Sequence, residues 1–269
     1  FASTVLKISS SKSKNYFLLV TKIQIFLQPI RFSGCLKFKL KPSNHRTTKP
    51  MYQEILNELK PTNTTLVAVS KTKPNEAVRA LYEQGHRDFG ENKAQELTPK
   101  YEALPKDIRW HRIGHLQTNK VKYIAPFVHL IHSVDSQKVL KEINKQARKN
   151  ERVIDCLLQF KIAAEDTKYG FDPQTAKAML ESEAFQNYEH VRIVGVMGMA
   201  TFTEDETRVR QEFRRLREIF ETLQRDYFAD DPAFKEISMG MSGDYKIAIE
   251  EGSTMVRIGT LLFGARSYN

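Results

Sequence analysis

Residues 191–196 read VRIVGV, a nearly continuous run of apolar residues interrupted by Arg192 and Gly195. This run continues to Met199 and predicts a β-strand over residues 191–199 that is covered on both faces, as the strands of parallel sheets are. Seven further short apolar runs have the same character, and they lie at residues 65–71, 87–91, 109–114, 129–134, 153–161, 236–239 and 255–264. The sequence therefore predicts eight strands.

Segments with apolar residues at spacings of three and four lie between these runs, and the clearest are residues 74–84, 136–149 and 204–227. They predict helices, and Thr203 and Glu206 have the spacing of a capping box at the start of the longest one. Strands that alternate with helices indicate right-handed βαβ units and a parallel sheet. Eight such units favour an α/β fold of the TIM type, a single closed (β/α)8 barrel. No Gly-x-Gly-x-x-Gly follows the first strand, so a dinucleotide-binding fold has no support.

The net charge of +10 is unevenly distributed along the 269 residues. Residues 1–50 hold ten Lys or Arg and no Asp or Glu, which leaves 32 basic and 32 acidic residues from position 51 onward. A folded nucleic-acid-binding domain carries its basic surplus on the domain itself, so we expect no nucleic-acid partner. We also expect no membrane partner, because no apolar run approaches the ~20 residues needed to cross a bilayer.

Residues 1–50 differ in composition from the rest and end in a linker rich in Lys, Thr and Pro. We expect this segment to be disordered, either as an organellar leader or, as we favour, an extension upstream of Met51. The barrel is then predicted over residues 51–269. Two cysteines, Cys35 and Cys156, exclude a disulfide framework. A reducing compartment fits this count, and we expect the cytoplasm.

In barrels of this kind the functional residues lie where the strands end. Lys71 ends the first predicted strand, where burial would depress the pKa of its amine and make it a usable nucleophile. A lone lysine at a strand end more often simply reaches solvent, so the residues around Lys71 decide between the two interpretations. Ser242 follows the seventh strand, and Arg257, Gly259 and Thr260 belong to the eighth run. Small and hydroxyl-bearing residues there predict a phosphate site, which adjoins Lys71 because strands one and eight meet in a closed barrel.

Three further residues come from other strands. Asn92 follows the second strand and places an amide at its end. His111 lies in the third strand and alternates with Ile113, so it either faces the site or is a hydrogen-bonded residue of the barrel interior. Met199 follows the sixth strand and is either part of the core or a soft wall against a planar ring.

At these positions the sequence resembles the pyridoxal phosphate homeostasis (YggS/PROSC) family. The matching stretches are AVSKTKP at 68–74, GEN at 90–92, WHxIGxLQxNK at 110–120, KxG at 168–170, MGMSxD at 239–244 and VRIG at 256–259, where x marks a position outside the match. They occur in the family's order and span residues 66–264, but they do not include residues 1–50.

The resemblance implies the fold-type III barrel of pyridoxal 5′-phosphate (PLP) proteins such as alanine racemase, with PLP held as a Schiff base on Lys71. It places Arg257 against the pyridine nitrogen and the phosphate among Ser242, Gly259 and Thr260. Asn92 and Met199 lie beside the ring, and His111 belongs to a family motif. Lys120 and Lys168 also lie in family motifs and are candidates to guide an anion. We expect no metal.

The chain ends five residues after Gly264, which leaves no room for the C-terminal β-domain of the racemases. We therefore expect a monomeric, non-catalytic carrier that buffers PLP and delivers it to apo-enzymes. The alternatives are a racemase-like PLP enzyme and an aldolase whose Lys71 attacks a sugar-phosphate carbonyl. The absorption spectrum and borohydride trapping distinguish them.

Overall fold

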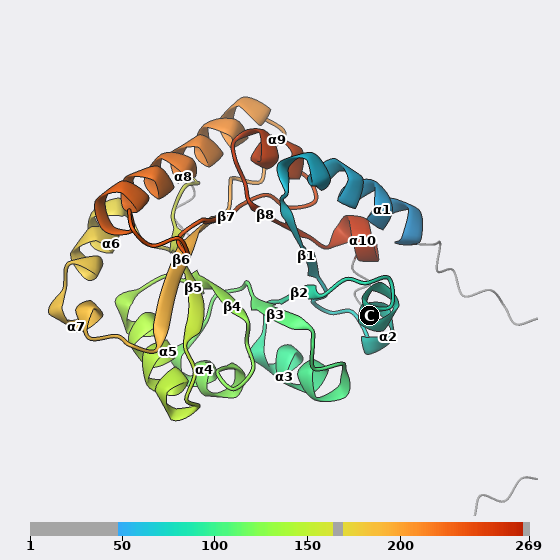
Figure 1. Ribbon diagram of the computed structural model, residues 1–269. Helices are drawn as coiled ribbons and strands as arrows, with labels where there is room; N and C mark the ends of the chain where they lie inside the picture. Colours follow the sequence, from blue (N-terminus) through green and yellow to red (C-terminus); the bar gives the residue numbers. More distant parts are fainter. Residues whose placement is uncertain (1–47, 164–168, 266–269) are drawn as a thin grey trace, which may run out of the picture. The chain divides into compact units, whose positions relative to one another are not determined.

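The computed structural model describes residues 48–163 and 169–265, which form a closed barrel of eight parallel strands in sequential order (Figure 1). The strands are β1 (Thr65–Val69), β2 (Asp88–Glu91), β3 (Arg109–Arg112), β4 (Leu130–Val134), β5 (Ile154–Phe160), β6 (Val191–Gly198), β7 (Glu236–Ser238) and β8 (Met255–Ile258). β8 pairs with β1 from Thr65↔Met255 to Ala68↔Ile258, and this pairing closes the barrel. The predicted (β/α)8 fold is confirmed.

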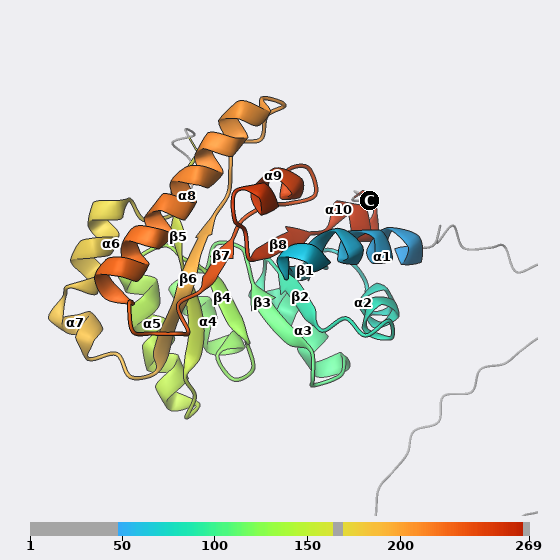
Figure 2. The same cartoon turned by 45° about the horizontal axis from the view of Figure 1, so that its top comes forward.

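The helices are arranged around the outside of the strands (Figures 1 and 2). They are α1 (Thr48–Leu59), the 3-10 turn η1 (Lys60–Thr62), α2 (Asn75–Tyr82), α3 (Ala94–Ala103), α4 (Thr118–Ile124), α5 (Gln137–Lys149), α6 (Pro173–Leu180), α7 (Glu183–Gln186), α8 (Glu206–Tyr227), α9 (Tyr245–Glu250) and α10 (Thr260–Phe263). None of the helices in the described part of the chain has the length and apolar character that crossing a membrane requires.

Two apolar clusters hold the barrel together. The larger one lies between strands and helices and includes Phe89, Trp110 and Phe213, each fully buried. The smaller one is separate from it and consists of six residues, Val67, Leu130, Leu157, Val194, Met197 and Met255, with Met199 packed against it. On β1, Val67 belongs to the smaller cluster whereas Leu66 and Ala68 belong to the larger one. This alternation is what a strand with one face toward the barrel interior requires.

Three element ends differ from the prediction. The predicted capping box at Thr203 and Glu206 is wrong, because the carboxylate of Asp205 caps α8 by accepting from the Arg208 N–H at 3.1 Å. β8 ends at Ile258, and the last part of the predicted run forms α10 instead. α1 begins at Thr48, ahead of the predicted start of the barrel, and residues 1–47 lie outside the described part.

Candidate functional site

Each mouth of the barrel carries a cavity. The C-terminal cavity has a volume of about 540 Å³, and seven of the eight predicted site residues line it: Lys71, Asn92, Met199, Ser242, Arg257, Gly259 and Thr260. The N-terminal cavity, of about 370 Å³, is lined by residues that begin the strands. The C-terminal cavity has the size of small-molecule sites and lies where barrel enzymes bind their ligands, so it is the candidate functional site.

A tight turn delivers Lys71 to the C-terminal cavity. The Ser70 N–H still donates to the Gly90 carbonyl at 3.0 Å, and the Lys73 N–H closes the turn on the Ser70 carbonyl at 3.0 Å. Between them Thr72 has φ = 63°, a left-handed conformation that costs a β-branched residue about 1–3 kcal/mol. The Thr72 N–H is held by the Glu96 carboxylate at 2.9 Å, so neighbouring contacts maintain this conformation beside the lysine.

A buried ion pair supports the same turn from the helix side. The Lys100 ammonium donates to Glu91 Oε1 at 2.6 Å and to the Ser70 carbonyl at 2.8 Å. The Ser70 hydroxyl donates to the same Glu91 oxygen at 2.6 Å. Burial raises the pKa of Glu91, and Lys100 and Ser70 oppose that rise. The sequence placed Glu91 in a motif but gave it no role, and Lys100 was not predicted. Only the fold brings Lys100 of α3 to the end of β1.

The strand ends of β7 and β8 form a cradle of small donors. The Gly259 N–H lies 3.3 Å from the Ser242 hydroxyl oxygen, and Thr260 begins α10 directly after it. A Cβ at Gly259 would lie 3.1 Å from the Val69 carbonyl oxygen, so glycine lets this loop approach the end of β1. Gly243 faces open space. Exposed N–H and hydroxyl donors in such loops are suited to a phosphate group.

Arg257 is buried at the cavity wall, with 4% of its surface exposed. Its Nη1 donates to the Ser238 hydroxyl at 2.6 Å and its Nη2 donates to the Gly198 carbonyl at 3.0 Å. Burial lowers the pKa of Arg257 to about 10, which leaves the guanidinium charged at neutral pH. A lysine amine, hydroxyl and amide donors and a fixed cation in one cavity fit a molecule that bears a phosphate, an aldehyde and a ring nitrogen.

The outer part of the C-terminal cavity contains residues that the sequence did not suggest. His115 and Tyr169 both line it and stack on each other, with ring centroids 3.8 Å apart. His115 Nδ1 lies 2.7 Å from the Asp135 carboxylate. Phe202, after β6, is 99% exposed and also lines the cavity. The available signal for His115 was its position three residues after the end of β3, where side chains reach the C-terminal mouth.

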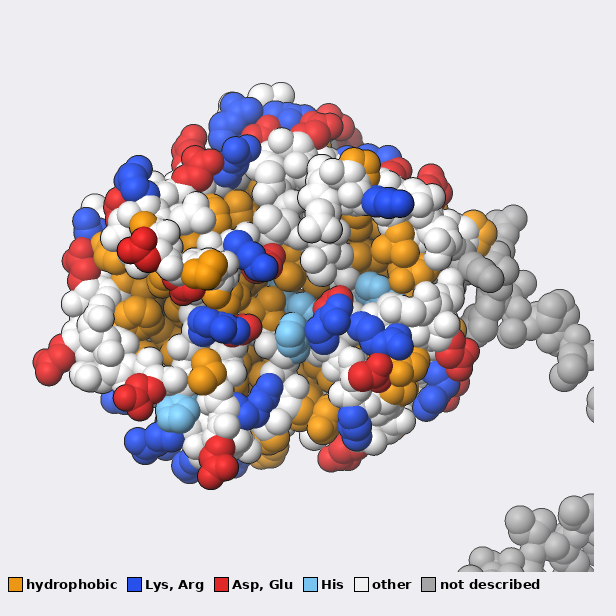
Figure 3. Space-filling view, viewed as in Figure 1, with side chains coloured by type: hydrophobic (Ala, Val, Ile, Leu, Met, Phe, Trp, Pro, Cys, Tyr) orange, Lys and Arg blue, Asp and Glu red, His pale blue; other side chains and the backbone are white. Residues whose placement is uncertain are grey.

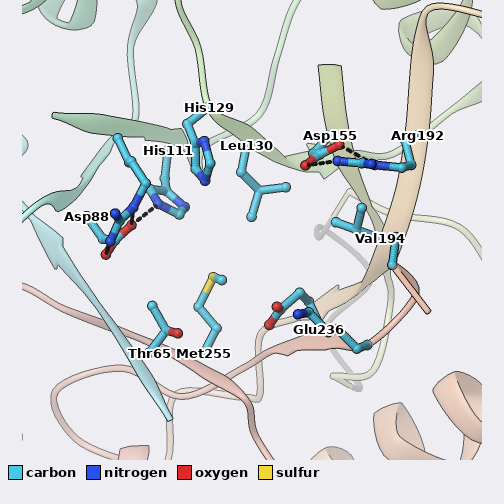
Figure 4. A pocket seen from close by; sticks show the side chains of 13 residues that line it. Thr65, Asp88, His111, His129, Leu130, Asp155, Arg192, Val194, Glu236 and Met255 are labelled. Carbon is cyan, nitrogen blue, oxygen red and sulfur yellow. Dashed lines mark hydrogen bonds and ion pairs between the residues drawn. The ribbon is translucent and has the colours of Figure 1, made fainter. Parts of the chain in front are cut away.

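His111 is not among the residues of the C-terminal cavity. It lines the N-terminal cavity instead, and its Nε2 lies 3.1 Å from Asp88 Oδ1 (Figure 4). The prediction that His111 binds the cofactor is therefore corrected. Strand alternation correctly pointed its side chain inward, but His111 precedes the strand end by one residue, and the next inward residue, Ile113, lines the C-terminal cavity. Figure 3 shows charged and histidine side chains gathered around the middle of one face of the barrel.

The two lysines proposed to guide an anion are not placed at the site. Lys120 lies on α4 and is not among the residues of the C-terminal cavity. Lys168 lies outside the described residues. Within the described ranges 48–163 and 169–265, no group of three or more His, Cys, Asp or Glu side chains is arranged to hold a metal ion.

Comparisons with known proteins agree with this geometry. The family model described as "Alanine racemase, N-terminal domain" matches residues 51–267. The pyridoxal phosphate homeostasis protein of Aquifex aeolicus is 46% identical over 204 residues, which cover 76% of this chain and 87% of that protein. The protein of the same name from Schizosaccharomyces pombe is 33% identical over 207 residues, covering 76% and 85%.

Solved structures of related proteins also superpose on this chain. PipY of Synechococcus elongatus with PLP bound superposes with a TM-score of 0.73 at 33% identity, over 81% of this chain and all of that one. Alanine racemase of Bartonella henselae superposes with a TM-score of 0.59 at 16% identity, over 80% of this chain and 57% of that one. At that identity the second likeness concerns the fold alone.

Proposed function

The chain belongs to the alanine racemase N-terminal domain family, in which it groups with the pyridoxal phosphate homeostasis proteins, and we propose that it holds PLP on Lys71 and buffers and delivers that cofactor. The observation that carries the proposal is the meeting of Lys71 with Ser242, Gly259 and Thr260 in one cavity at the C-terminal mouth. The PLP bound to PipY, a relative 33% identical, supports the choice of ligand.

In this proposal each residue of the cavity has one task. The amine of Lys71 would condense with the PLP aldehyde, with loss of water, and hold the cofactor as a Schiff base, while Ser242, Gly259 and Thr260 would donate to the phosphate. Asn92 and Met199 would lie beside the ring, and Arg257 would donate to the pyridine nitrogen. PLP supplies a reactive aldehyde and a ring that, when protonated on its nitrogen, takes up electrons.

Arg257 favours a carrier over a catalyst. A guanidinium is a donor without acceptor capacity, and with its pKa at about 10 it keeps its protons at neutral pH. A cation that donates to the pyridine nitrogen disfavours protonation of that nitrogen. The site then stabilises a carbanion less well than a site with a protonated ring, so it favours retention and release of the cofactor over amino-acid turnover.

The proposed partners are apo forms of PLP-dependent enzymes, which accept the cofactor. We propose a monomer in the cytoplasm as the working form. Cys156 is a free, fully buried thiol, and burial raises its pKa, so it does not react as a thiolate. A structural free cysteine is typical of a reducing compartment.

Borohydride reduction followed by peptide mass mapping tests the attachment point. We expect protein incubated with PLP to carry a reduced pyridoxyl group on Lys71, and Lys71→Ala to carry none. Lys73→Ala is the matched control: Lys73 lines the same cavity, but its ammonium donates to the carbonyls of Phe263, Gly264 and Ala265, so its loss should leave the label in place. A label on another lysine contradicts the proposal. In a parallel incubation with sugar phosphates instead of PLP, a reduced sugar-phosphate adduct on Lys71 would indicate the aldolase.

One observation favours amino-acid racemisation as a second function. The hydrogen bond between His115 and Asp135 orients an imidazole at the edge of the C-terminal cavity, as in sites where a histidine moves protons. Incubation with L-alanine and PLP at high protein concentration, followed by chiral separation, tests it. Racemisation would be established if the wild type forms D-alanine and neither Lys71→Ala nor His115→Gln does. If the wild type forms no D-alanine, racemisation of this substrate is excluded.

A further inference from the structure

A row of five hydrogen-bonded side chains crosses the barrel interior from the N-terminal cavity to Arg257. Asp88 Oδ1 lies 3.1 Å from His111 Nε2, and His111 Nδ1 lies 2.9 Å from His132 Nε2. His132 Nδ1 lies 2.9 Å from the Ser238 hydroxyl, which lies 2.6 Å from Arg257 Nη1. The five residues, hereafter the interior row, come from β2, β3, β4, β7 and β8, and all are buried. Figure 4 shows the Asp88 and His111 end of the row.

The two ends of the interior row set the direction of its hydrogen bonds. Arg257 can only donate, so the Ser238 oxygen accepts from it and keeps a second lone pair and its proton for His132. At the other end Asp88 accepts when ionised, so His111 donates to it from Nε2. With neutral rings, His111 Nδ1 then accepts from His132 Nε2, and His132 Nδ1 accepts the Ser238 proton. In this state every bond points from Arg257 toward Asp88, whereas a proton on Nδ1 of either ring would reverse the bonds between that ring and Ser238.

The electrostatics of the interior support this arrangement. Burial lowers the pKa of His132 well below its ordinary value, which favours the neutral ring. Burial would raise the pKa of Asp88, but hydrogen bonds from His111 and Arg109 outweigh it and hold that pKa well below its usual range. Arg109 Nε donates to Asp88 Oδ1 at 2.6 Å. The row thus ends on a fixed negative charge at the mouth opposite the proposed cofactor site.

We propose that Asp88, His111, His132 and Ser238 are positioning residues that fix the orientation of the Arg257 guanidinium toward the cofactor ring. This inference rests on the proposed function, because Arg257 is assigned to the pyridine nitrogen there. Ser238 accepts from Arg257 in either orientation of the row, and the ionised acceptor at Asp88 keeps the Ser238 proton directed at His132, away from the guanidinium. A change of charge at Asp88 then alters the hydrogen bond between Arg257 and the cofactor, because the hydrogen bonds of the row polarise one another.

The first experiment compares two matched carboxylates of the N-terminal cavity. Asp155 lines the same cavity and is paired with Arg192 through bonds of 2.8 and 2.9 Å, but the contacts that the structure gives it do not join the interior row. Figure 4 shows both carboxylates. Asp88→Asn keeps the shape of the side chain and removes the ionised acceptor, and Asp155→Asn makes the same change outside the row.

We expect Asp88→Asn to weaken PLP binding by about threefold to tenfold, the range for loss of one or two well-formed hydrogen bonds. It should also move the pH at which the absorption band of the bound cofactor titrates, whereas Asp155→Asn should leave both quantities at the wild-type values. Equal effects of the two variants, or no effect of either, would overturn the positioning role. The titration of the band separates positioning from a loss of stability, which would change the amount of bound cofactor without moving that pH.

The second experiment needs neither a variant that folds nor the cofactor. In the wild-type apo-protein labelled with 15N-histidine, nitrogen chemical shifts and couplings report which ring nitrogen carries the proton. We expect His111 and His132 to be neutral and protonated on Nε2. An imidazolium, or a proton on Nδ1 of either ring, would overturn the direction of the row and with it the proposal. If both histidines show the expected tautomers but the protein takes up no PLP, the proposed function is refuted and the description of the interior row stands.

Discussion

His86 links α1 to β2 through two contacts of its imidazole. Its Nδ1 lies 3.3 Å from the Tyr52 hydroxyl, and its Nε2 lies 2.8 Å from the Asp88 carbonyl. Burial lowers the pKa of His86 to about 4, against an ordinary value of 6.5. Between these pH values the unfolded chain binds the proton and the folded chain does not. The contribution of His86 to stability is therefore full above pH 6.5 and is lost as the pH falls toward 4.

We predict that the lowered pKa of His86 reduces the free energy of unfolding by up to about 3 kcal/mol as the pH falls from 6.5 to 4. His86→Gln removes the titration, so its unfolding free energy should fall less steeply over the same interval. Urea unfolding at several pH values between 7 and 4 measures both slopes. A variant with the same slope as the wild type would contradict the assignment.

Sequence reasoning reached the site residues whose role follows from where a strand ends. Lys71 and Ser242 follow strand ends, so their presence at one mouth could be predicted from a closed barrel. His111 could not be placed, because alternation gives the direction of a side chain but not its height in the barrel. His132 and Ser238 were missed for a related reason: their partners come from strands that are distant in sequence, and only the closed barrel joins them.

At the level of elements, Gly195 decides how β6 pairs with its neighbour β7. It has φ = 151°, and a Cβ there would lie 1.8 Å from the Glu236 carbonyl oxygen. The register between β5 and β6 also shifts here, since Cys156 pairs with Ile193 but Leu157 pairs with Gly195. The glycine therefore permits both the irregular pairing and the close approach of β7.

We predict that Gly195→Ala destabilises the protein by about 3 kcal/mol or more, because the new methyl group would overlap backbone that has no room to move. Gly243→Ala is the control: a Cβ there meets open space, and the unfolding free energy should change by less than about 0.5 kcal/mol. Thermal or urea unfolding compares the two. Similar stability losses would show that the β6–β7 contact is not the cause.

The strands could be predicted closely because each is buried on both faces and is therefore a compact apolar run. The predicted strand over residues 191–199 corresponds to β6 (Val191–Gly198), and that over 129–134 corresponds to β4 (Leu130–Val134). The run over 255–264 was too long, since apolarity does not distinguish β8 from the helical turn α10 after Gly259. Short helices such as α4 and α7 were not predicted, because they contain too few residues to show the helical spacing of apolar side chains.

For the whole molecule, PLP should stabilise the fold because it binds the folded barrel and not the unfolded chain. At a concentration 100 times its dissociation constant, a ligand adds about 2.7 kcal/mol. For a chain of this size that corresponds to a rise of roughly 5–10 °C in the unfolding midpoint. We predict a smaller rise for Lys71→Ala, which keeps the phosphate donors but loses the covalent bond. An unchanged midpoint of the wild type at saturating PLP would contradict binding.

The most direct test of the central claim is the absorption spectrum of the purified protein during titration with PLP. The account predicts a visible absorption band characteristic of a lysine Schiff base that saturates at one PLP per chain. The band should be absent from Lys71→Ala and retained in Lys73→Ala. A protein that stays colourless with added PLP, or a band that survives in Lys71→Ala, would contradict the claim that Lys71 holds the cofactor.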